Sequence, residues 1–380
     1  MPVALTDEQR NFRDAIRAFA LRELGTRERR CELTAGFTRH HNEEIYRAMA
    51  DNGWIGVGIP EQYGGSGGGT VEMCVLLEEA TYGRVPFAGY GTSRIVAGPF
   101  ERFGTEAQKH EVLTAIASGA VEAIAMSEPE AGSDVANIKT FADRRNGSFV
   151  VNGHKTWISN AHLAAHMLVV LRTTRTDNKH EGLTMLWVPT DAVGVEIRPI
   201  ELMGGAEVND IYLTDVEVPA NALVGQVDQA WTQLMSGLNG ERLILASVML
   251  GLARRAFDDI VAYVKERRQF GRPIGSFQAL RHRIADLAVE IEATKLLVYD
   301  VAATIDGDPR GMFPREASMA KLKATEVAKR TALEGMQMMG GYGYASEYDM
   351  EGAVRSALVS TIYGGTSEIQ REIISKTYGL

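Results

Sequence analysis

The segment from Ala125 to Asp134 combines small residues, hydroxyl groups and a glycine. It reads Ala-Met-Ser-Glu-Pro-Glu-Ala-Gly-Ser-Asp, with hydroxyls at Ser127 and Ser133 and a glycine at Gly132. A loop of this kind lets backbone N–H groups approach a flat ligand that is rich in carbonyl oxygens. Turns are also rich in these residues, so the segment by itself leaves a plain turn and a ligand loop both open.

A tryptophan lies between two polar stretches shortly downstream. Residues 152–160 read Asn-Gly-His-Lys-Thr-Trp-Ile-Ser-Asn, which places Trp157 on an expected strand. An indole at such a position packs into a core or lies against a cofactor, and the residue type alone leaves both open.

Other familiar ligand motifs are missing from the sequence. The glycine cluster Gly64–Gly69 lacks the lysine of a phosphate-binding loop, so we expect a flexible turn between helices. No dinucleotide-binding GxGxxG follows a strand. Cys31 and Cys74 are far apart and give neither a disulfide framework nor a metal-binding CxxC pair.

The composition restricts the class of protein. The chain has 380 residues, of which 45% are hydrophobic and 23% charged, so it is not a disordered, collagenous or disulfide-rich chain. This length predicts two or three domains. The formal net charge of −9 argues against a protein built chiefly to bind nucleic acid or anionic membrane. Met1–Arg10 holds no apolar signal segment, and the longest nearly apolar run, Leu243–Ala253, is too short to span a bilayer, so we expect a soluble, cytoplasmic protein.

Helices are expected first, from the N-terminus to about Glu122. Thr6 and Gln9 form a capping box at the start of an amphipathic helix. The apolar residues beyond it recur at helical spacing, at Phe12, Ile16, Phe19 and Leu24.

A β domain is expected in the middle of the chain, from about Ala123 to Asp228. The pairs Asn146-Gly147 and Asn152-Gly153 are typical of tight hairpin turns. Four runs have the pattern of strands: Phe149–Val151, Met167–Leu171, Leu183–Val188 and Asp210–Val218.

Long helices are expected again after Ala230. Two apolar stripes with a spacing of three to four residues predict a helical bundle. They are Leu243, Ala246, Leu250, Phe257, Ile260 and Val264, and Leu280, Ile284, Leu287, Ile291 and Val298.

Five ordered motifs together resemble the acyl-CoA dehydrogenase family. They are Ser-Glu-Pro-x-Ala-Gly-Ser-Asp from Ser127; Asn-Gly-x-Lys-x-Trp-Ile-Ser-Asn from Asn152; Arg-Arg-Gln-Phe-Gly from Arg267, with Gln278; Gln-Met-Met-Gly-Gly-Tyr-Gly from Gln337; and Gly-Thr-Ser-Glu-Ile-Gln-Arg from Gly365. The resemblance covers essentially the whole chain. It implies an α+β fold with an N-terminal α domain (1–122), a middle β-barrel or sandwich domain (123–232) and a C-terminal four-helix bundle (233–380).

The resemblance also implies a flavoprotein. It implies a homotetramer with one FAD per subunit, and an electron-transfer flavoprotein as the oxidant of the reduced enzyme. Residues implied to hold the flavin ring of the same subunit are Met126, Ser127, Gly132, Ser133, Trp157, Ile158 and Ser159, and Thr366 and Glu368 are implied to contact the same FAD. Residues implied to reach the FAD of a neighbouring subunit are Arg267, Phe270, Gln278, Gln337, Gly340 and Gly341. An arginine suits a diphosphate, and paired glycines allow close approach of the backbone or simply end a helix.

The general base is not at its commonest family position. Many members carry a Tyr-Glu-Gly-Thr motif, and here the same stretch reads Tyr363-Gly364-Gly365-Thr366, in which Gly364 has no carboxylate. Residues 239–243, Asn-Gly-Glu-Arg-Leu, resemble the segment that supplies the base in isovaleryl-CoA dehydrogenase-like members. We therefore assign the base to Glu241, at the expected start of the first C-terminal helix, where an acidic residue would also suit the helix dipole without any chemistry.

The expected reaction is oxidation of an acyl-CoA to the trans-2-enoyl-CoA, as in fatty acid or branched-chain acyl metabolism. The resemblance makes the N–H of Gly364 a donor to the thioester oxygen, and places Ser133, Asn239, Arg242, Tyr363 and Gly365 on the substrate side. Asn239 stands where aspartate is commoner. The alternatives are an acyl-CoA oxidase or flavin monooxygenase on the same scaffold, and a non-catalytic acyl-CoA-binding relative. No metal is expected.

Overall fold

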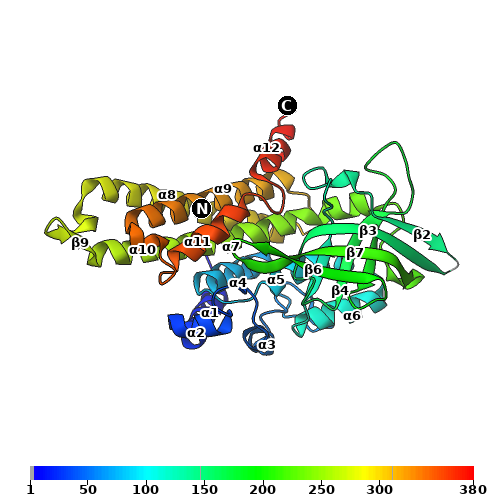
Figure 1. The fold of residues 1–380 in the computed structure, drawn as a ribbon, viewed down its shortest axis with the longest axis horizontal. Coiled ribbons are helices and arrows are strands. Elements are labelled where there is room, and N and C mark those ends of the chain that lie inside the picture. The colour runs from blue at the N-terminus through cyan, green and yellow to red at the C-terminus, as the bar shows by residue number, and fades with distance from the viewer. Residues whose placement is uncertain (1–3, 146, 310) are drawn as a thin grey trace. The chain divides into compact units, whose positions relative to one another are not determined.

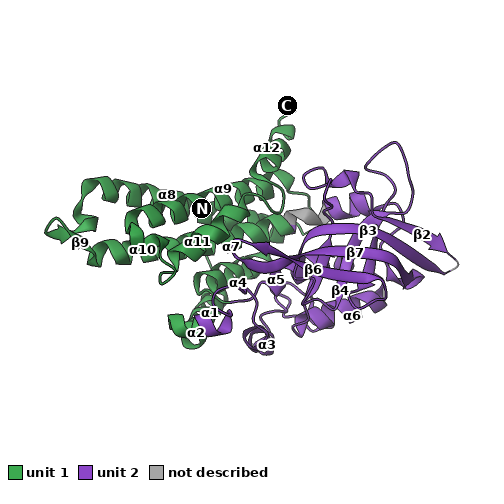
Figure 2. Cartoon of the chain, viewed as in Figure 1, with its two compact units in different colours: residues 1–30, 69–85, 241–380 green, residues 31–68, 86–240 purple. Residues whose placement is uncertain are grey.

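The computed structural model describes residues 4–380 except Asn146 and Arg310, and it leaves out the side chains of residues 236–239. The chain forms two compact units (Figure 2). The helical unit consists of Met1–Arg30, Gly69–Val85 and Glu241–Leu380, and the sheet unit of Cys31–Gly68 and Pro86–Gly240.

The helical unit is built from helices that differ widely in length (Figure 1). They are α1 (Asp7–Leu24), α2 (Arg27–Leu33, whose last residues belong to the sheet unit), α4 (Thr70–Tyr82), α7 (Ala230–Glu266, from Glu241 onward), α8 (Gln278–Gly307), α9 (Pro314–Met339), α10 (Gly341–Tyr344), α11 (Met350–Ser360) and α12 (Ser367–Lys376). A hairpin of two short strands, β9 (Arg268–Gln269) and β10 (Arg272–Pro273), joins α7 to α8.

Helix α9 packs against α8, α11 and α12, while α4 packs against α1 and α8. The expected apolar stripes contribute to the buried core: Ile260, Val264 and Leu287 lie in one cluster with Met338 and Met350. Such sustained burial along several helices confirms the predicted bundle.

Buried charges also tie the first helices to the bundle. The Glu79 carboxylate of α4 accepts hydrogen bonds from Arg17 of α1 at 2.7 Å and from Arg254 of α7 at 2.9 Å. The neighbouring Glu78 accepts a 2.5 Å bond from the Tyr299 hydroxyl of α8. Four helices that are distant in sequence therefore share one ionic cluster.

The sheet unit combines a sheet with shorter helices. The helices are α3 (Glu43–Asp51), α5 (Gly89–Phe103) and α6 (Glu106–Ala117), together with the first turns of α7. The strands are β1 (Glu122–Ala125), β2 (Phe141–Arg145), β3 (Ser148–Ser159), β4 (His166–Arg172), β5 (Leu183–Pro189), β6 (Val195–Leu202), β7 (Gly205–Pro219) and β8 (Leu223–Val224).

The strands form one eight-stranded sheet with the order β6-β7-β3-β2-β4-β5-β8, and β1 pairs with β4 in parallel. Its long central strand β3 pairs antiparallel with both β2 and β7. One face meets a core formed with α5 and α6, which includes Phe100, Val112, Leu168 and Met185. β3 is thus held on both edges, which suits it to carry a ligand-binding side chain.

Several sequence predictions are confirmed locally. Thr6 and Gln9 form the capping box of α1, and Ile16, Phe19 and Leu24 are buried. Gly64–Gly69 precedes the first residue of α4 and forms the expected connection. The four expected strands lie within β3, β4, β5 and β7, while β6 had no clear signal because its burial does not alternate regularly.

The prediction of a hairpin turn at Asn152-Gly153 is wrong. Both residues lie within β3, where the pairing with β7 shifts register between Val151 and Gly153. Asn152 instead binds the opposite strand, donating to the Asp215 carboxylate and accepting from the Asp215 N–H, each at 2.9 Å. A bulge has replaced the turn. In the other predicted hairpin, Asn146 lies outside the described residues, while Arg145 pairs with Ser148 across it.

The predicted start of the first C-terminal helix is also wrong. Helix α7 begins at Ala230, eleven residues before Glu241 (241 − 230 = 11), so Glu241 does not lie in a first helical turn. A helix dipole acts only over the terminal turn and therefore gives no reason for a carboxylate there. None of the described helices combines the length and apolar character that a membrane crossing needs.

Candidate active site

A buried ion pair shapes the loop after β1 in the sheet unit. The Lys155 ammonium is fully buried and donates to the Glu128 carboxylate at 2.8 Å and to the Met126 carbonyl at 2.9 Å. The same carboxylate accepts the N–H groups of Lys139 at 2.6 Å and Thr140 at 2.9 Å. The loop that contains Met126 and Ser127 is therefore fastened to β3 from inside.

The pKa values of this pair reflect burial and mutual attraction. Burial lowers the pKa of Lys155 to about 8, although the Glu128 charge opposes the shift. Burial alone would raise the pKa of Glu128, but the attraction and hydrogen bond of Lys155 bring it below its usual value. We conclude that the pair is ionised at neutral pH, since the Glu128 carboxylate accepts hydrogen bonds from three donors.

Trp157 is presented at the surface of the sheet unit. Its backbone has a positive φ of 61° at an irregularity in the β3–β7 pairing between Lys155 and Ile158. The residue is 58% exposed, so it is not a core tryptophan. The neighbouring Thr156 N–H donates to the Ser127 carbonyl at 3.0 Å. The exposed indole and the predicted ligand loop are thus adjacent.

The remaining predicted residues of this unit lie on the same two segments. Gly132 and Ser133 are exposed on the loop, while Ile158 is buried beside Trp157 and its carbonyl accepts from the Asn209 amide at 3.0 Å. Ser159 ends β3 and is partly exposed. An exposed aromatic plane next to a loop of small residues fits a flat, carbonyl-rich ring such as a flavin.

In the helical unit, Glu241 of α7 lies next to Gly364. A Cβ atom placed on Gly364 would stand 3.6 Å from Glu241 Oε1 and would collide with Leu245 Cδ1. Gly364 and Gly365 both have positive φ, at 59° and 79°. The turn therefore needs glycine at these positions, and its backbone faces the carboxylate directly.

Burial raises the pKa of the Glu241 carboxylate above its usual value, while the positive charges of Arg242 and Lys321 act in the opposite direction. Burial lowers the pKa of Arg242, and Glu241 opposes that shift. Burial also raises the pKa of Tyr363, which precedes the glycine pair, to about 12. A buried carboxylate with raised proton affinity, next to a glycine turn, is suited to accept a proton from carbon. The Asn239 side chain lies outside the described residues.

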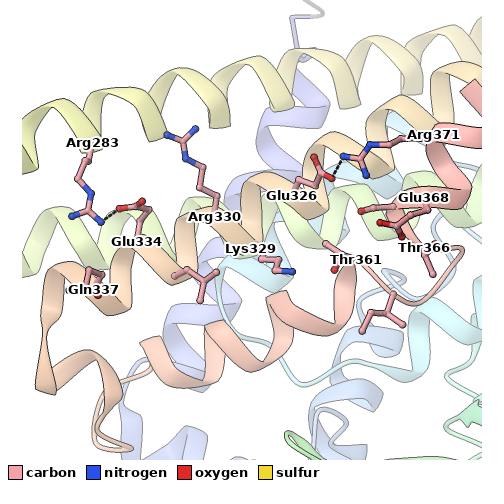
Figure 3. A pocket seen from close by; sticks show the side chains of 13 residues that line it. Arg283, Glu326, Lys329, Arg330, Glu334, Gln337, Thr361, Thr366, Glu368 and Arg371 are labelled. Carbon is pink, nitrogen blue, oxygen red and sulfur yellow. Dashed lines mark hydrogen bonds and ion pairs between the residues drawn. The ribbon is translucent and has the colours of Figure 1, made fainter. Parts of the chain in front are cut away.

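A cavity of about 770 Å³ opens on the helical unit beside this turn (Figure 3). Three predicted FAD contacts, Gln337, Thr366 and Glu368, line it together. Its other lining residues are Arg283, Glu326, Lys329, Arg330, Leu333, Glu334, Thr361, Ile362, Ser367 and Arg371. Two ion pairs, Arg283–Glu334 and Arg371–Glu326, lie along its wall (Figure 3).

The cavity offers unused hydrogen-bonding capacity at the start of α12. Thr366 caps this helix by accepting the Ile369 N–H at 3.3 Å. The Ser367 hydroxyl is buried and has no hydrogen-bond partner among the described residues. A helix N-terminus, an orphaned hydroxyl and several cationic side chains together fit a polar, anionic cofactor such as FAD.

The other predicted contacts lie around the β9–β10 hairpin and the end of α9. Phe270 is 91% exposed and has a φ of 52°, and Gln278 is exposed at the start of α8. The Arg267 guanidinium lies 5.2 Å from the ring centre of Tyr342. Gly340, with a φ of 60°, ends α9, and Gly341 begins α10. These residues are presented outward and do not line the cavity beside the turn.

Sequence reasoning missed the residues that hold the two sites in shape. Glu128 and Lys155 were within the motifs but had no role assigned to them. Gln370 was likewise within a motif without an assigned role. Lys321 had no signal, because a lysine in a helix is usually exposed.

Three family models together match most of the chain. Models for the N-terminal, middle and C-terminal domains of acyl-CoA dehydrogenase match residues 6–120, 123–216 and 228–379. The chain belongs to the acyl-CoA dehydrogenase family. The matches confirm the predicted fold, and members of this family are FAD-dependent oxidoreductases.

Two relatives and one solved structure indicate how similar the family members are. The chain is 36% identical to a probable acyl-CoA dehydrogenase, YngJ, of Bacillus subtilis, over 99% of both chains. It is 36% identical to the caffeyl-CoA reductase-Etf complex subunit CarC of Acetobacterium woodii, over 88% of this chain and 89% of that one. The acyl-CoA dehydrogenase structure from Geobacillus kaustophilus matches with a TM-score of 0.93 and 32% identity, covering 100% of both chains.

Proposed function

We propose that this acyl-CoA dehydrogenase family member oxidises an acyl-CoA thioester to the trans-2-enoyl-CoA, with Glu241 as the general base. The observation that carries the proposal is the Glu241 carboxylate beside the Gly364 turn, with Oε1 3.6 Å from the position of a Cβ on that glycine. Burial raises the pKa of this carboxylate, which strengthens it as a base. FAD, when bound, supplies a hydride acceptor for the β-carbon of the substrate.

The chain's own residues have two tasks in this reaction. Glu241 removes the proton from the α-carbon, because its buried carboxylate lies beside Gly364 and has a raised pKa. The Gly364 N–H donates to the thioester oxygen and so stabilises the negative charge that develops there. Leu245 takes up the space of a side chain at residue 364, so the base approaches from α7 instead.

The same proposal assigns the binding residues. In the sheet unit, Trp157 and the loop from Met126 to Ser133 would hold the flavin ring, and in the helical unit Thr366 and Glu368 would contact the same FAD. Arg242, Tyr363 and Gly365 would lie along the acyl-CoA, with Ser133. This role of Arg242 fits the positive charge that CoA requires, and the family's CoA thioester substrates support it.

We further propose a homotetramer in which Arg267, Phe270, Gln278, Gln337, Gly340 and Gly341 reach the FAD of a neighbouring subunit. The exposed aromatic ring of Phe270 supports this, because a large apolar side chain at 91% exposure is suited to a partner surface. We also propose an electron-transfer flavoprotein as the acceptor, which the name of the Acetobacterium woodii relative supports. The three-domain division at residues 122 and 232, the isovaleryl-like position of the base, and a branched or medium-to-long acyl group are part of the same proposal.

Glu241→Gln is the variant that tests the base. It keeps the shape and the polarity of the side chain but cannot take up the α-proton, so we expect the FAD content to be unchanged and dehydrogenation to be abolished. The assay is anaerobic bleaching of the flavin by a panel of straight and branched acyl-CoA substrates. Glu372→Gln, in an exposed ion pair on α12, is the matched control and should behave as wild type. Undiminished bleaching in Glu241→Gln would refute the assignment. Rapid oxygen consumption after reduction would favour an oxidase on the same scaffold.

A further inference from the structure

Lys321 is a fully buried lysine in the N-terminal third of α9. Its ammonium group donates to two backbone carbonyls, of Ser360 at 3.0 Å and of Gly365 at 2.8 Å. These two carbonyls lie at the start and the end of the turn that joins α11 to α12. One cation therefore closes the segment that contains Gly364.

A second side chain fastens the same turn. The buried Gln370 amide donates to the carbonyls of Gly364 and Gly365, each at 3.0 Å. Both glycines have positive φ and contribute no side chain that could hold this part of the turn. Its conformation depends on the donors of Lys321 and Gln370, and so does the direction of the Gly364 N–H.

The charge of Lys321 also acts on the carboxylate opposite the turn. The charged groups that influence Lys321 are Glu241 and Arg242 of α7 and Glu368 of α12. Burial lowers the pKa of Lys321 to about 8, while Glu241 opposes the shift. In return, Lys321 and Arg242 favour the ionised form of Glu241 and so limit the rise of its pKa. At neutral pH Lys321 is thus a cation whose charge acts on the proposed base.

We propose that Lys321 is a positioning residue for the reaction, which fixes the Gly364 turn through two carbonyls and keeps Glu241 ionised through its charge. The proposal rests on the proposed function, because Lys321 can affect the reaction through the turn and the carboxylate only if Glu241 is the base. Lys321 would touch neither substrate nor cofactor. Its two effects are separable, because the hydrogen bonds control the turn and the charge controls the proton affinity of the base.

Three variants separate these effects in the FAD-loaded enzyme. Lys321→Met removes the hydrogen-bond donor and the charge. Lys321→Gln removes the charge but keeps an amide donor on a side chain that is one bond shorter. Lys321→Arg keeps the charge. Lys323→Met is the matched control, because Lys323 lies on the same helix in a partly exposed pair with Glu290. The measurements are FAD content and the dependence of kcat and kcat/KM on pH, with octanoyl-CoA and isovaleryl-CoA as probes.

The base must be ionised, so the rate falls as the pH drops through the pKa of Glu241. Loss of the nearby cation raises that pKa, so the acid limb of the kcat/KM profile should move to higher pH in Lys321→Met and Lys321→Gln. It should stay in place in Lys321→Arg and in the control. Lys321→Met should also lose about 100-fold in plateau kcat, as expected for a displaced donor.

An acid limb that stays at the wild-type pH in both neutral variants overturns the proposal, whether or not the plateau kcat falls. Loss of FAD or of folding in both neutral variants overturns it as well, because Lys321 would then serve the fold alone. Glu241→Gln distinguishes this failure from failure of the proposed function. If Glu241→Gln is inactive and the limb is unmoved, only the role of Lys321 is refuted, whereas an active Glu241→Gln refutes the base itself.

Discussion

The substitution Lys155→Met would break the buried ion pair that fastens the ligand loop of the sheet unit. Lys155 is fully buried and Glu128 is 6% exposed. Without Lys155, the Glu128 carboxylate would retain only the backbone N–H groups of Lys139 and Thr140. Breaking a buried pair by removing one partner costs about 3–5 kcal/mol, and the two remaining N–H groups place this case near the lower end, at about 3 kcal/mol.

A double-mutant cycle measures the pair itself. Lys155→Met, Glu128→Gln and the double variant are compared by urea unfolding, followed by tryptophan fluorescence. All four tryptophans, Trp54, Trp157, Trp187 and Trp231, lie in the sheet unit, so the signal reports on that unit. We expect each single variant to be destabilised and the double variant to lose less than the sum, with a coupling of about 2 kcal/mol. Lys139→Met breaks an exposed pair with Glu130 and should change stability by less than about 0.5 kcal/mol.

The pH dependence gives a second check on the same pair. The pKa of Lys155 is about 8 in the folded protein, below its usual value, so the native state binds fewer protons than the unfolded state above that pH, and stability rises. The Glu128 charge raises the pKa of Lys155, so this pKa is lower in Glu128→Gln. The stability of the variant therefore begins to rise at a lower pH than that of the wild type. The destabilisation of Glu128→Gln relative to wild type should therefore shrink as the pH increases toward about 8.

The reasoning about the pair would be refuted by a loss below about 1 kcal/mol in Lys155→Met, which is the range of an ordinary exposed pair. Strict additivity in the double variant would refute it equally. A functional consequence follows from the position of the pair: the loop with Met126 and Ser127 should hold FAD less tightly in Lys155→Met, measured as flavin retained after gel filtration.

Two further predictions concern backbone positions with positive φ. Trp157→Gly should change the stability of the FAD-free protein by less than about 1 kcal/mol, because relief of left-handed strain offsets the added entropy of the unfolded chain, yet FAD should be lost readily. Thermal unfolding by circular dichroism and flavin retention check this, and full retention of FAD would contradict it. Gly364→Ala should destabilise by about 1–3 kcal/mol, because the new methyl group collides with Leu245 at a φ of 59°. Leu245→Ala in the same chain should recover part of this loss, and an unchanged unfolding temperature in Gly364→Ala would contradict the collision.

The sequence predicted much of the fold because several signals were local. Thr6 fixes the start of α1 through its own side chain, and Gly340 ends α9 by its left-handed φ. The start of α7 was missed because Gly237 and Gly240 weaken the helical pattern ahead of Glu241, although the helix runs through from Ala230. Asn152-Gly153 has the composition of a turn, but pairing with a neighbouring strand overrides that preference.

The sequence identifies the predicted site residues more readily than the buried residues that hold them in place. Trp157 and Gly364 stand out by type, since an indole between polar stretches and a missing carboxylate are visible in the motifs. Lys155 and Lys321 do not, because burial of a lysine depends on contacts made across the fold. Lys155 meets Met126 and Glu128 across the sheet unit, and Lys321 meets the carbonyls of Ser360 and Gly365 in the helical unit.

The two buried lysines differ in one respect that bears on the chemistry. Each has its pKa lowered to about 8 by burial, and each donates to a backbone carbonyl of a segment that we propose binds cofactor or substrate. Lys155 has a dedicated carboxylate, Glu128, within hydrogen-bond distance, so its charge is compensated permanently. Among the described residues, Lys321 donates only to carbonyls, and Glu241 is the main anion that opposes the lowering of its pKa. If Glu241 takes up a proton during the reaction, Lys321 loses that compensation at the same moment, which favours return of the proton once product has formed. The lysine of the sheet unit can therefore only hold a loop, whereas that of the helical unit is coupled to the protonation state of the proposed base.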